Sequence, residues 1–217
     1  MKIARGLGTA VLCLSLTVTT AAVAAESTVG YALSVHCVDC HGNDGYSARG
    51  ERPNLAHQKE DYLVLQLRRF REIFIKMFGG TGYYDPATAL RDHPAMNHQA
   101  GHLSDDAIKN IAAYYAGLPC KVRTNRPPLP RPAVAEVCIQ CHGAGGVSAS
   151  PNIANLAGQN EAYLLIQLKA FRKSTIPLAN AFVFPNRRHP EMSRLARHLT
   201  NANLRAIAAY FNRLPCS

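Results

Sequence analysis

The chain has 217 residues, of which 47% are hydrophobic and 18% are charged, a composition that is typical of globular proteins and excludes a largely disordered one. Its 24 Lys and Arg against 14 Asp and Glu give a formal net charge of +10, which favours acidic macromolecules as partners. After residue 25 no stretch is long and apolar enough to cross a bilayer, so an integral membrane protein is not expected.

Residues 1–25 have the pattern of a secretory signal peptide. Lys2 and Arg5 precede an apolar run, and small residues follow it and form a cleavage site of the Ala-x-Ala type. We expect cleavage near Ala24 or Ala25 and a mature protein outside the cytoplasm, where disulfides persist. A membrane anchor is the alternative, although the apolar run is short for a membrane span.

An internal repeat fills the rest of the chain. The stretch 54–71 recurs as 155–172, at an offset of 101 residues, and the stretch 93–120 recurs as 189–216, at an offset of 96. The difference between the two offsets arises around residues 78–84, whose glycines indicate a loop insertion in the first copy.

The repeat and a stiff, proline-rich segment between the copies divide the chain into domains. We expect a signal peptide at 1–25, a first domain at 26–120, a Pro-rich linker at 121–133 and a second domain at 134–217.

Each copy is predicted to contain three helices joined by long loops, without strands. The first helix carries a cysteine motif at its end. The second, at 59–74 and 161–173, has Leu and Phe at helical spacing, and the last begins after an N-cap at Ser104 or Thr200. Because a domain of about 95 residues with so much loop has a thin core, we expect a further group to fill it.

The motif C-x-x-C-H occurs once in each copy. It consists of Cys37, Cys40 and His41 in the first copy, and of Cys138, Cys141 and His142 in the second. Two thiols at this spacing can add to the vinyl groups of one haem, and the adjacent His then faces the iron. A structural zinc site and a thioredoxin-type dithiol are the alternatives, but the motifs lie in separate repeats and no βαβ pattern surrounds them. The motifs predict two covalently attached haem c groups.

Met96 and Met192 lie at matching positions, in predicted loops, and are the candidate sixth ligands of the two irons. A thioether raises the reduction potential of haem iron. A methionine more often only fills a gap in a core, but the repeat and the scarcity of other methionines favour ligation here. Met77 is a rival in the first copy. The histidines that repeat, and that offer bis-His ligation instead, are His93, His189, His102 and His198.

The order of the motifs is also distinctive. In the second copy C-x-x-C-H is followed by N-L-A-G-Q-x-x-x-Y-L, a late Met, L-T and A-A-Y-F, and the first copy has nearly the same order. This layout resembles cytochrome c4, the dihaem class I cytochromes c of bacteria, over essentially the whole mature chain. The resemblance implies an all-α fold of two tandem class I cytochrome c domains related by pseudo-twofold symmetry. It also implies ligation by His41 with Met96 and by His142 with Met192.

The first copy departs from the family pattern at two positions. In these cytochromes the carbonyl of a proline usually holds the proximal histidine, and Pro151 falls at that position in the second copy, whereas the first has Gly50. His57 replaces the glycine found at Gly158. We therefore expect the environment of the first haem to differ in detail.

Cys120 and Cys216 remain at equivalent ends of the two copies. In an oxidising compartment a mutual disulfide, which closes a loop of about 96 residues, is the economical interpretation. Free thiols and a disulfide between molecules are the alternatives.

After the predicted signal peptide, the net positive charge lies in the second half of the chain. Residues 26–123 contain 11 basic and 11 acidic residues, whereas 11 basic and 3 acidic residues follow. We expect the second domain to dock an acidic redox partner, and the alternative is a solvated basic face. The candidate docking residues flank Met192 and are Arg187, Arg188, Arg194 and Arg197. Nucleic acid is not expected as a ligand.

The resemblance implies an electron-transfer protein and not an enzyme. It implies a soluble or loosely membrane-associated periplasmic carrier of single electrons, with a quinol-oxidising complex as donor and a terminal oxidase as acceptor. An electron-accepting subunit of a periplasmic dehydrogenase is a second interpretation. A dihaem enzyme with one open haem, such as a peroxidase or a thiosulfate dehydrogenase, is a third, and the paired methionines argue against it.

Overall fold

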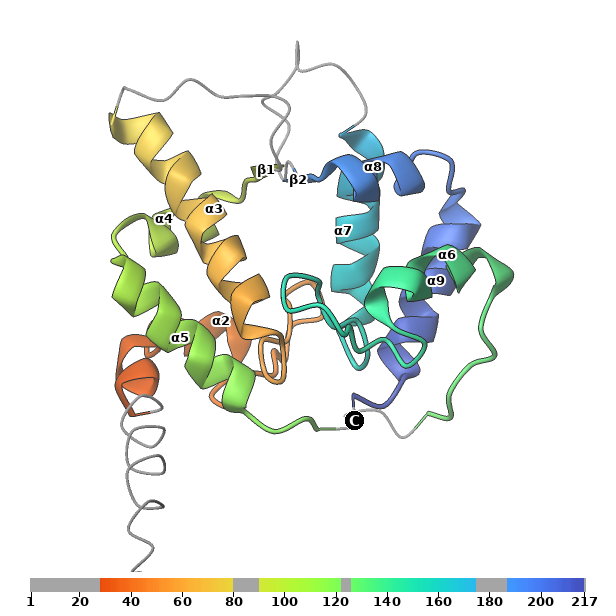
Figure 1. Ribbon diagram of the computed structural model, residues 1–217, viewed down its shortest axis with the longest axis horizontal. Coiled ribbons are helices and arrows are strands. Elements are labelled where there is room, and N and C mark those ends of the chain that lie inside the picture. The colour runs from red at the N-terminus through yellow and green to blue at the C-terminus, as the bar shows by residue number, and fades with distance from the viewer. Residues whose placement is uncertain (1–27, 80–89, 122–125, 175–186, 217) are drawn as a thin grey trace, which may run out of the picture.

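The computed structural model describes residues 28–79, 90–121, 126–174 and 187–216. Within these ranges the chain forms two helical lobes that lie side by side (Figure 1). The predicted signal peptide and residues 80–84 of the predicted insertion lie outside the described residues. No helix in the described part is both long and apolar enough to cross a membrane.

The first lobe begins with a helical stretch at residues 28–33. It continues with α2 (Val38–His41), α3 (Glu60–Gly79), the two-residue strand β1 (Leu90–Arg91), α4 (Pro94–Gly101) and α5 (Asp105–Gly117). The second lobe contains η1 (Ala133–Ala135), α6 (Glu136–His142), α7 (Glu161–Lys173), β2 (Arg187–Arg188), α8 (Pro190–Ala196) and α9 (Asn201–Arg213). In each lobe the long middle helix, α3 or α7, packs against the two helices that follow it.

The predicted N-caps of the last helices are confirmed. The Ser104 side chain accepts a hydrogen bond from the Ala107 backbone N–H, and Thr200 forms a capping box with Asn203. Helix α3 runs beyond the predicted end at residue 74, because no helix-breaking residue occurs before Gly79.

The short helices α4 and α8 were not predicted, and the expectation that both methionines lie in loops was wrong. Pro94 and Pro190 occupy the first positions of these helices, where a missing N–H costs nothing. The Nδ1 atom of the preceding histidine, His93 or His189, accepts the methionine N–H and caps the helix. Histidine is an uncommon N-cap, which is why the sequence did not reveal these starts.

The hydrophobic cores are small and lie between the last helix and the middle helix of each lobe. The buried cluster of the first lobe consists of Leu63, Ile111, Ala112 and Tyr115. That of the second consists of Ala135, Leu164, Leu168, Leu204, Ile207, Ala208, Tyr210 and Phe211. The stretch 28–33 crosses α5 at close range, since a Cβ on Gly30 would lie 2.2 Å from the Asn110 carbonyl oxygen. Thin cores of this kind leave room for a further group between the helices.

Reciprocal hydrogen bonds join the two lobes with pseudo-twofold symmetry. The Gln159 Oε1 atom accepts the Asn54 N–H at 2.8 Å, and the Gln58 Oε1 atom accepts the Asn155 N–H at 2.6 Å. In return, Gln159 Nε2 donates to the Asn54 carbonyl and Gln58 Nε2 to that of Asn155. The repeated N-L-A-x-Q segment thus forms one of the contacts between the lobes, a role that the sequence did not suggest.

A disulfide joins Cys120 to Cys216 across the same boundary, with Cα atoms 5.8 Å apart. The intramolecular pairing expected from the sequence is therefore formed, and the structure favours neither free thiols nor a link between molecules. Cys216 is buried, and the hydroxyl of Tyr46 lies 4.0 Å from its sulfur.

Candidate haem sites

Helices α2 and α6 place the two C-x-x-C-H motifs at equivalent positions in the lobes. All four cysteines are free thiols, partly buried except for the exposed Cys141. Each motif is followed by a glycine, Gly42 or Gly143, with φ of +81°. A Cβ on these glycines would approach the Tyr46 or the Val147 carbonyl oxygen to within 2.2 Å, so only glycine allows the chain to turn back here.

The two histidines that follow the cysteines are buried and are held in the same way. His41 Nδ1 lies 3.0 Å from the Pro53 carbonyl oxygen, and His142 Nδ1 lies 2.8 Å from that of Ala154. A carbonyl oxygen can only accept, so each Nδ1 carries the proton and donates. The lone pair is then on Nε2, which is the arrangement of a metal-ligating histidine.

The expected proline contact was placed wrongly. The acceptors lie three residues beyond Gly50 and Pro151, whose carbonyls instead accept the backbone N–H groups of Tyr163 and Tyr62 from the other lobe. The first site therefore has the proline carbonyl contact after all, through Pro53, and it is the second site that uses another residue, Ala154.

The second departure from the family pattern is also accommodated. His57 has φ of +57°, close to the +67° of Gly158, and both backbone N–H groups donate to the end of the last helix of their lobe. A non-glycine residue in this left-handed region costs on the order of 1 kcal/mol. The local backbone of the two sites is thus the same.

Burial determines the electrostatics of the sites. It lowers the pKa of His41 and of His142, which keeps both imidazoles neutral at pH 7 and available to a metal. The Nε2 atom of His41 is buried and has no hydrogen-bond partner among the described residues, as expected for an atom that ligates iron. These residues fit a haem in each lobe.

The arrangement of the side chains argues against the zinc alternative. Burial raises the pKa of Cys37, and it raises that of Cys138 to about 11, so neither thiol is an activated thiolate. Within the described ranges, no three His, Cys, Asp or Glu side chains gather in a way that could hold a metal ion.

A serine and an asparagine, to which the sequence assigned no role, support each motif. Ser47 Oγ donates to the Cys40 carbonyl at 2.7 Å, and Ser148 Oγ donates to that of Cys141 at 2.8 Å. The side chains of Asn54 and Asn155 accept the backbone N–H groups of these serines. The serines and the asparagines recur at the same offset in the two copies, and this recurrence is the sequence signal that could have identified them.

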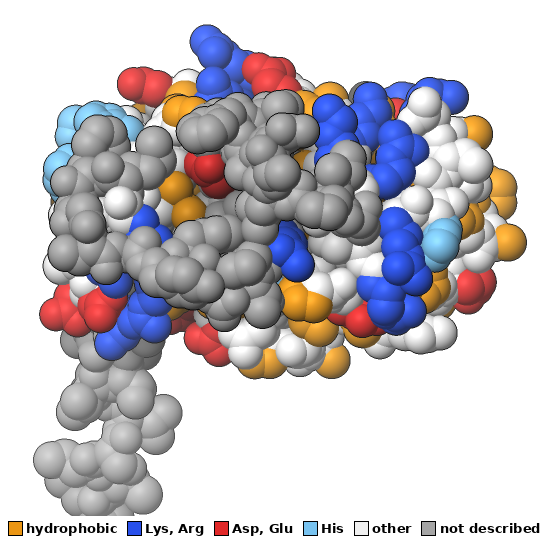
Figure 2. All heavy atoms as spheres, turned by 90° about the horizontal axis from the view of Figure 1, so that it is seen from above, with side chains coloured by type: hydrophobic (Ala, Val, Ile, Leu, Met, Phe, Trp, Pro, Cys, Tyr) orange, Lys and Arg blue, Asp and Glu red, His pale blue; other side chains and the backbone are white. Residues whose placement is uncertain are grey.

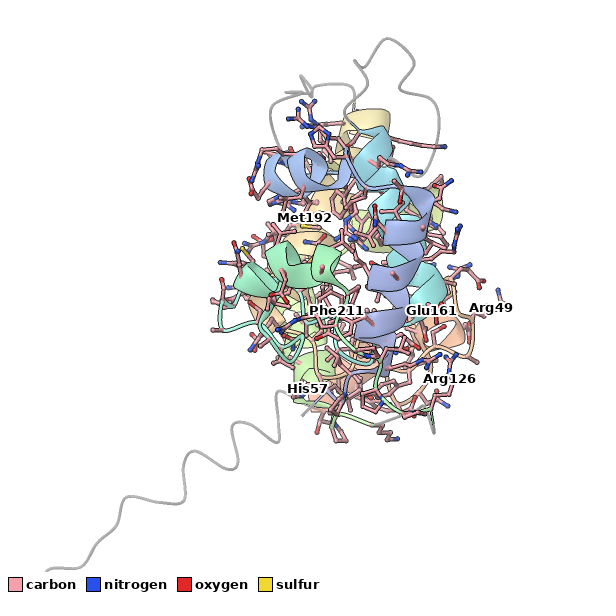
Figure 3. All side chains as sticks on the ribbon, turned by 90° about the vertical axis from the view of Figure 1, so that its right-hand side faces the viewer. Arg49, His57, Arg126, Glu161, Met192 and Phe211 are labelled. Atoms are coloured by element: carbon pink, nitrogen blue, oxygen red, sulfur yellow. A yellow bond between two sulfur atoms is a disulfide. The ribbon has the colours of Figure 1, made fainter. Side chains whose placement is uncertain are left out.

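Met192 reaches from α8 toward α6, the helix that carries the second motif (Figure 3). It is partly buried and packs against the same core cluster as Cys138. Met96 is partly buried at the equivalent place in α4. The side chain of Met77 lies outside the described residues.

The repeated histidines have other surroundings. His93 and His189 cap α4 and α8, as described above. His102 is exposed with its ring 4.9 Å from that of Phe74, and the exposed His198 accepts a hydrogen bond from Arg197. These contacts do not favour bis-His ligation.

The candidate docking arginines have different surroundings. The guanidinium of Arg187 donates to Tyr62 of the first lobe and to Gln167 within its own, which argues against a role in docking. Arg194 is exposed and paired with Glu191. Figure 2 shows Lys and Arg side chains gathered over the part of one face that the second lobe forms.

Three comparisons relate the chain to known proteins. The sequence model of the Cytochrome c family matches residues 27–118 and 132–215. Cytochrome c4 of Pseudomonas aeruginosa is 29% identical over 203 residues, which cover 88% of this chain and 90% of that protein. A thiosulfate dehydrogenase electron acceptor of Thiomonas intermedia is 29% identical over 203 residues, which cover 83% of this chain and 79% of that protein. The crystal structure of reduced cytochrome c4 from Pseudomonas stutzeri superposes with a TM-score of 0.63 at 25% identity, over 87% of this chain and 98% of that one.

Proposed function

Because the chain belongs to the cytochrome c family, as a dihaem protein of the cytochrome c4 type, we propose that it carries single electrons in the periplasm between a quinol-oxidising complex and a terminal oxidase. The observation that supports this best is the repeated histidine geometry, in which each buried imidazole is held at Nδ1 and leaves Nε2 for iron. We propose domains at 26–120 and 134–217, after a signal peptide at 1–25.

The residues that would hold the cofactors follow from this geometry. We propose thioether attachment at Cys37 and Cys40 and at Cys138 and Cys141, with axial ligands His41 and Met96 for one iron and His142 and Met192 for the other. Each bound haem supplies a reversible one-electron couple. The chain fixes the imidazoles through backbone carbonyls and surrounds them with packed helices, so that little reorganisation accompanies electron transfer.

The basic second domain supports docking to an acidic partner. Of the four arginines considered, Arg188, Arg194 and Arg197 remain candidates, and the last two are exposed. Such a surface raises the rate of association at low ionic strength.

Electron-transfer rates test this function. We expect the reduced protein to be oxidised by membranes that contain its terminal oxidase, with a second-order rate that falls about tenfold or more from low to physiological ionic strength. Replacing Arg194 and Arg197 together by Gln should lower the low-salt rate. Lys109→Gln, an exposed change in the first domain, is the control and should not. A rate that is indifferent to salt and to the double arginine change would contradict docking through the second domain.

The relative from Thiomonas intermedia favours one further candidate, an acceptor of electrons from a dehydrogenase. The rate at which the oxidised protein is reduced separates the two candidate functions. We would measure it with a thiosulfate dehydrogenase and thiosulfate, and with a quinol-oxidising complex. We expect the quinol-oxidising complex to be faster, and the opposite order would establish the second candidate.

A further inference from the structure

The peptide group between Pro53 and Asn54 forms hydrogen bonds on both of its sides. Its carbonyl oxygen accepts from His41 Nδ1 at 3.0 Å, and its N–H donates to the Oε1 atom of Gln159 at 2.8 Å. His41 belongs to the first domain and Gln159 to the second. A single planar amide therefore connects the histidine of one haem site with a side chain of the other domain.

The same connection runs in the opposite direction from the second haem site. The peptide group between Ala154 and Asn155 accepts from His142 Nδ1 at 2.8 Å. Its N–H donates to the Oε1 atom of Gln58, in the first domain, at 2.6 Å. Both connections use the Asn and the Gln of the repeated N-L-A-x-Q segment, so each domain supplies one glutamine to the other.

The two glutamines are buried and fixed in orientation. Gln58 is 8% exposed and Gln159 is 6% exposed. Each Oε1 atom also accepts the N–H of the next residue, Lys59 or Asn160, and each Nε2 atom donates to the carbonyl of the asparagine in the other domain. Because both lone pairs of each Oε1 atom are used, the oxygen stays directed at the peptide of the other domain.

Hydrogen bonds in series polarise the group that lies between them. An amide whose N–H donates becomes a better acceptor at its carbonyl oxygen, and the effect is larger in buried surroundings than in water. The bond from the histidine Nδ1–H to that carbonyl is then stronger, which makes the imidazole a more basic ligand at Nε2. A more basic ligand stabilises ferric iron relative to ferrous iron.

We propose that Gln58 and Gln159 are positioning residues that act across the boundary between the domains. Each strengthens the hydrogen bond of the other domain's histidine and thereby lowers the reduction potential of the haem in that domain. This proposal rests on the proposed function, in which His41 and His142 ligate iron. Gln159 thus belongs to the first haem site and Gln58 to the second, so the contact between the domains is part of what sets each potential.

Potentiometric titration of the purified dihaem protein tests this assignment with Gln159→Leu and Gln58→Leu. Leucine fills a similar volume but cannot accept the N–H. We expect Gln159→Leu to shift the equilibrium of the first haem about threefold or more toward the ferrous form, and that of the second haem by less than about 1.5-fold. Gln58→Leu should have the reverse pattern. Each haem is identified by the shifted methyl resonance of its own methionine.

A second readout follows the hydrogen bond itself. In the reduced, diamagnetic protein the resonance of the His41 Nδ1 proton should move upfield in Gln159→Leu, because a weaker hydrogen bond leaves the proton more shielded. Asn160→Ala is the matched control. It removes contacts between the domains, from Asn160 Nδ2 to the Arg52 carbonyl and to the Asn54 side chain, and it leaves the glutamine bonds in place. We expect it to change neither the resonance nor the potentials.

Two conservative changes separate the hydrogen bond from packing. Gln159→Glu keeps an acceptor oxygen and should not shift the first haem toward the ferrous form. Gln159→Asn is shorter by a methylene group, which withdraws the oxygen, so it should give the shift of the Leu variant and serves in its place where that variant fails to assemble. Potentials that stay at the Asn160→Ala level in the Leu and Asn variants, or a shift toward the ferrous form in the Glu variant, would overturn the proposal. A wild-type protein with two methionine-ligated haems would still support the proposed function in that case.

Discussion

Replacing Met192 by alanine is expected to lower the reduction potential of the second haem by on the order of 100 mV or more, because a neutral thioether that favours ferrous iron is lost. The far-red sulfur-to-iron charge-transfer band of that haem should disappear, while the first haem keeps its own. Met96→Ala should have the reciprocal effect. Spectroelectrochemical titration of each variant measures both quantities.

Met77→Ala is the matched control, because Met77 is the rival ligand that the sequence offers in the first domain. We expect it to leave both bands and both potentials unchanged. If the first haem lost its charge-transfer band in Met77→Ala and kept it in Met96→Ala, the ligand would be Met77.

Removal of the disulfide is the second change with a large expected effect. In the chain-entropy model, a cross-link between residues 96 apart, as Cys120 and Cys216 are, stabilises the folded state by about 4–5 kcal/mol. The double variant Cys120→Ser/Cys216→Ser should lose stability of this order. Because the bond joins the ends of the two domains, the variant should also unfold in two steps.

Denaturant unfolding, followed by helical circular dichroism and by haem absorbance, checks this expectation. Wild-type protein in a reducing agent is the control and should unfold with the double variant. Equal stability of the oxidised wild type and the double variant would show that the interdomain hydrogen bonds suffice without the disulfide.

The two-domain helical fold was predicted well from the sequence, because it depends on a repeat. The haem-binding roles of the cysteines and histidines stay predictions, which depend on a motif with fixed spacing. Ser104 and Thr200 are ordinary N-cap residues, and the helices they start were predicted accordingly. By contrast, α4 and α8 begin at histidine caps, which helix propensity does not indicate.

The hydrogen bonds between the domains could not be predicted from the sequence. Nothing local to Arg187 distinguishes a residue that binds Tyr62 across the boundary from one on a solvated basic face. The carbonyls that accept the hydrogen bonds of His41 and His142 lie three residues after the predicted positions, because the course of the loop decides which carbonyl faces the imidazole. Such assignments require the tertiary structure.

The most direct test of the account is a potentiometric titration of the wild-type holoprotein, followed in the visible and far-red spectrum. The account predicts two one-electron steps at high potential, with the sulfur-to-iron band lost in both as the protein is reduced. One low-potential step without that band would contradict it, because at least one of Met96 and Met192 would then not be a ligand.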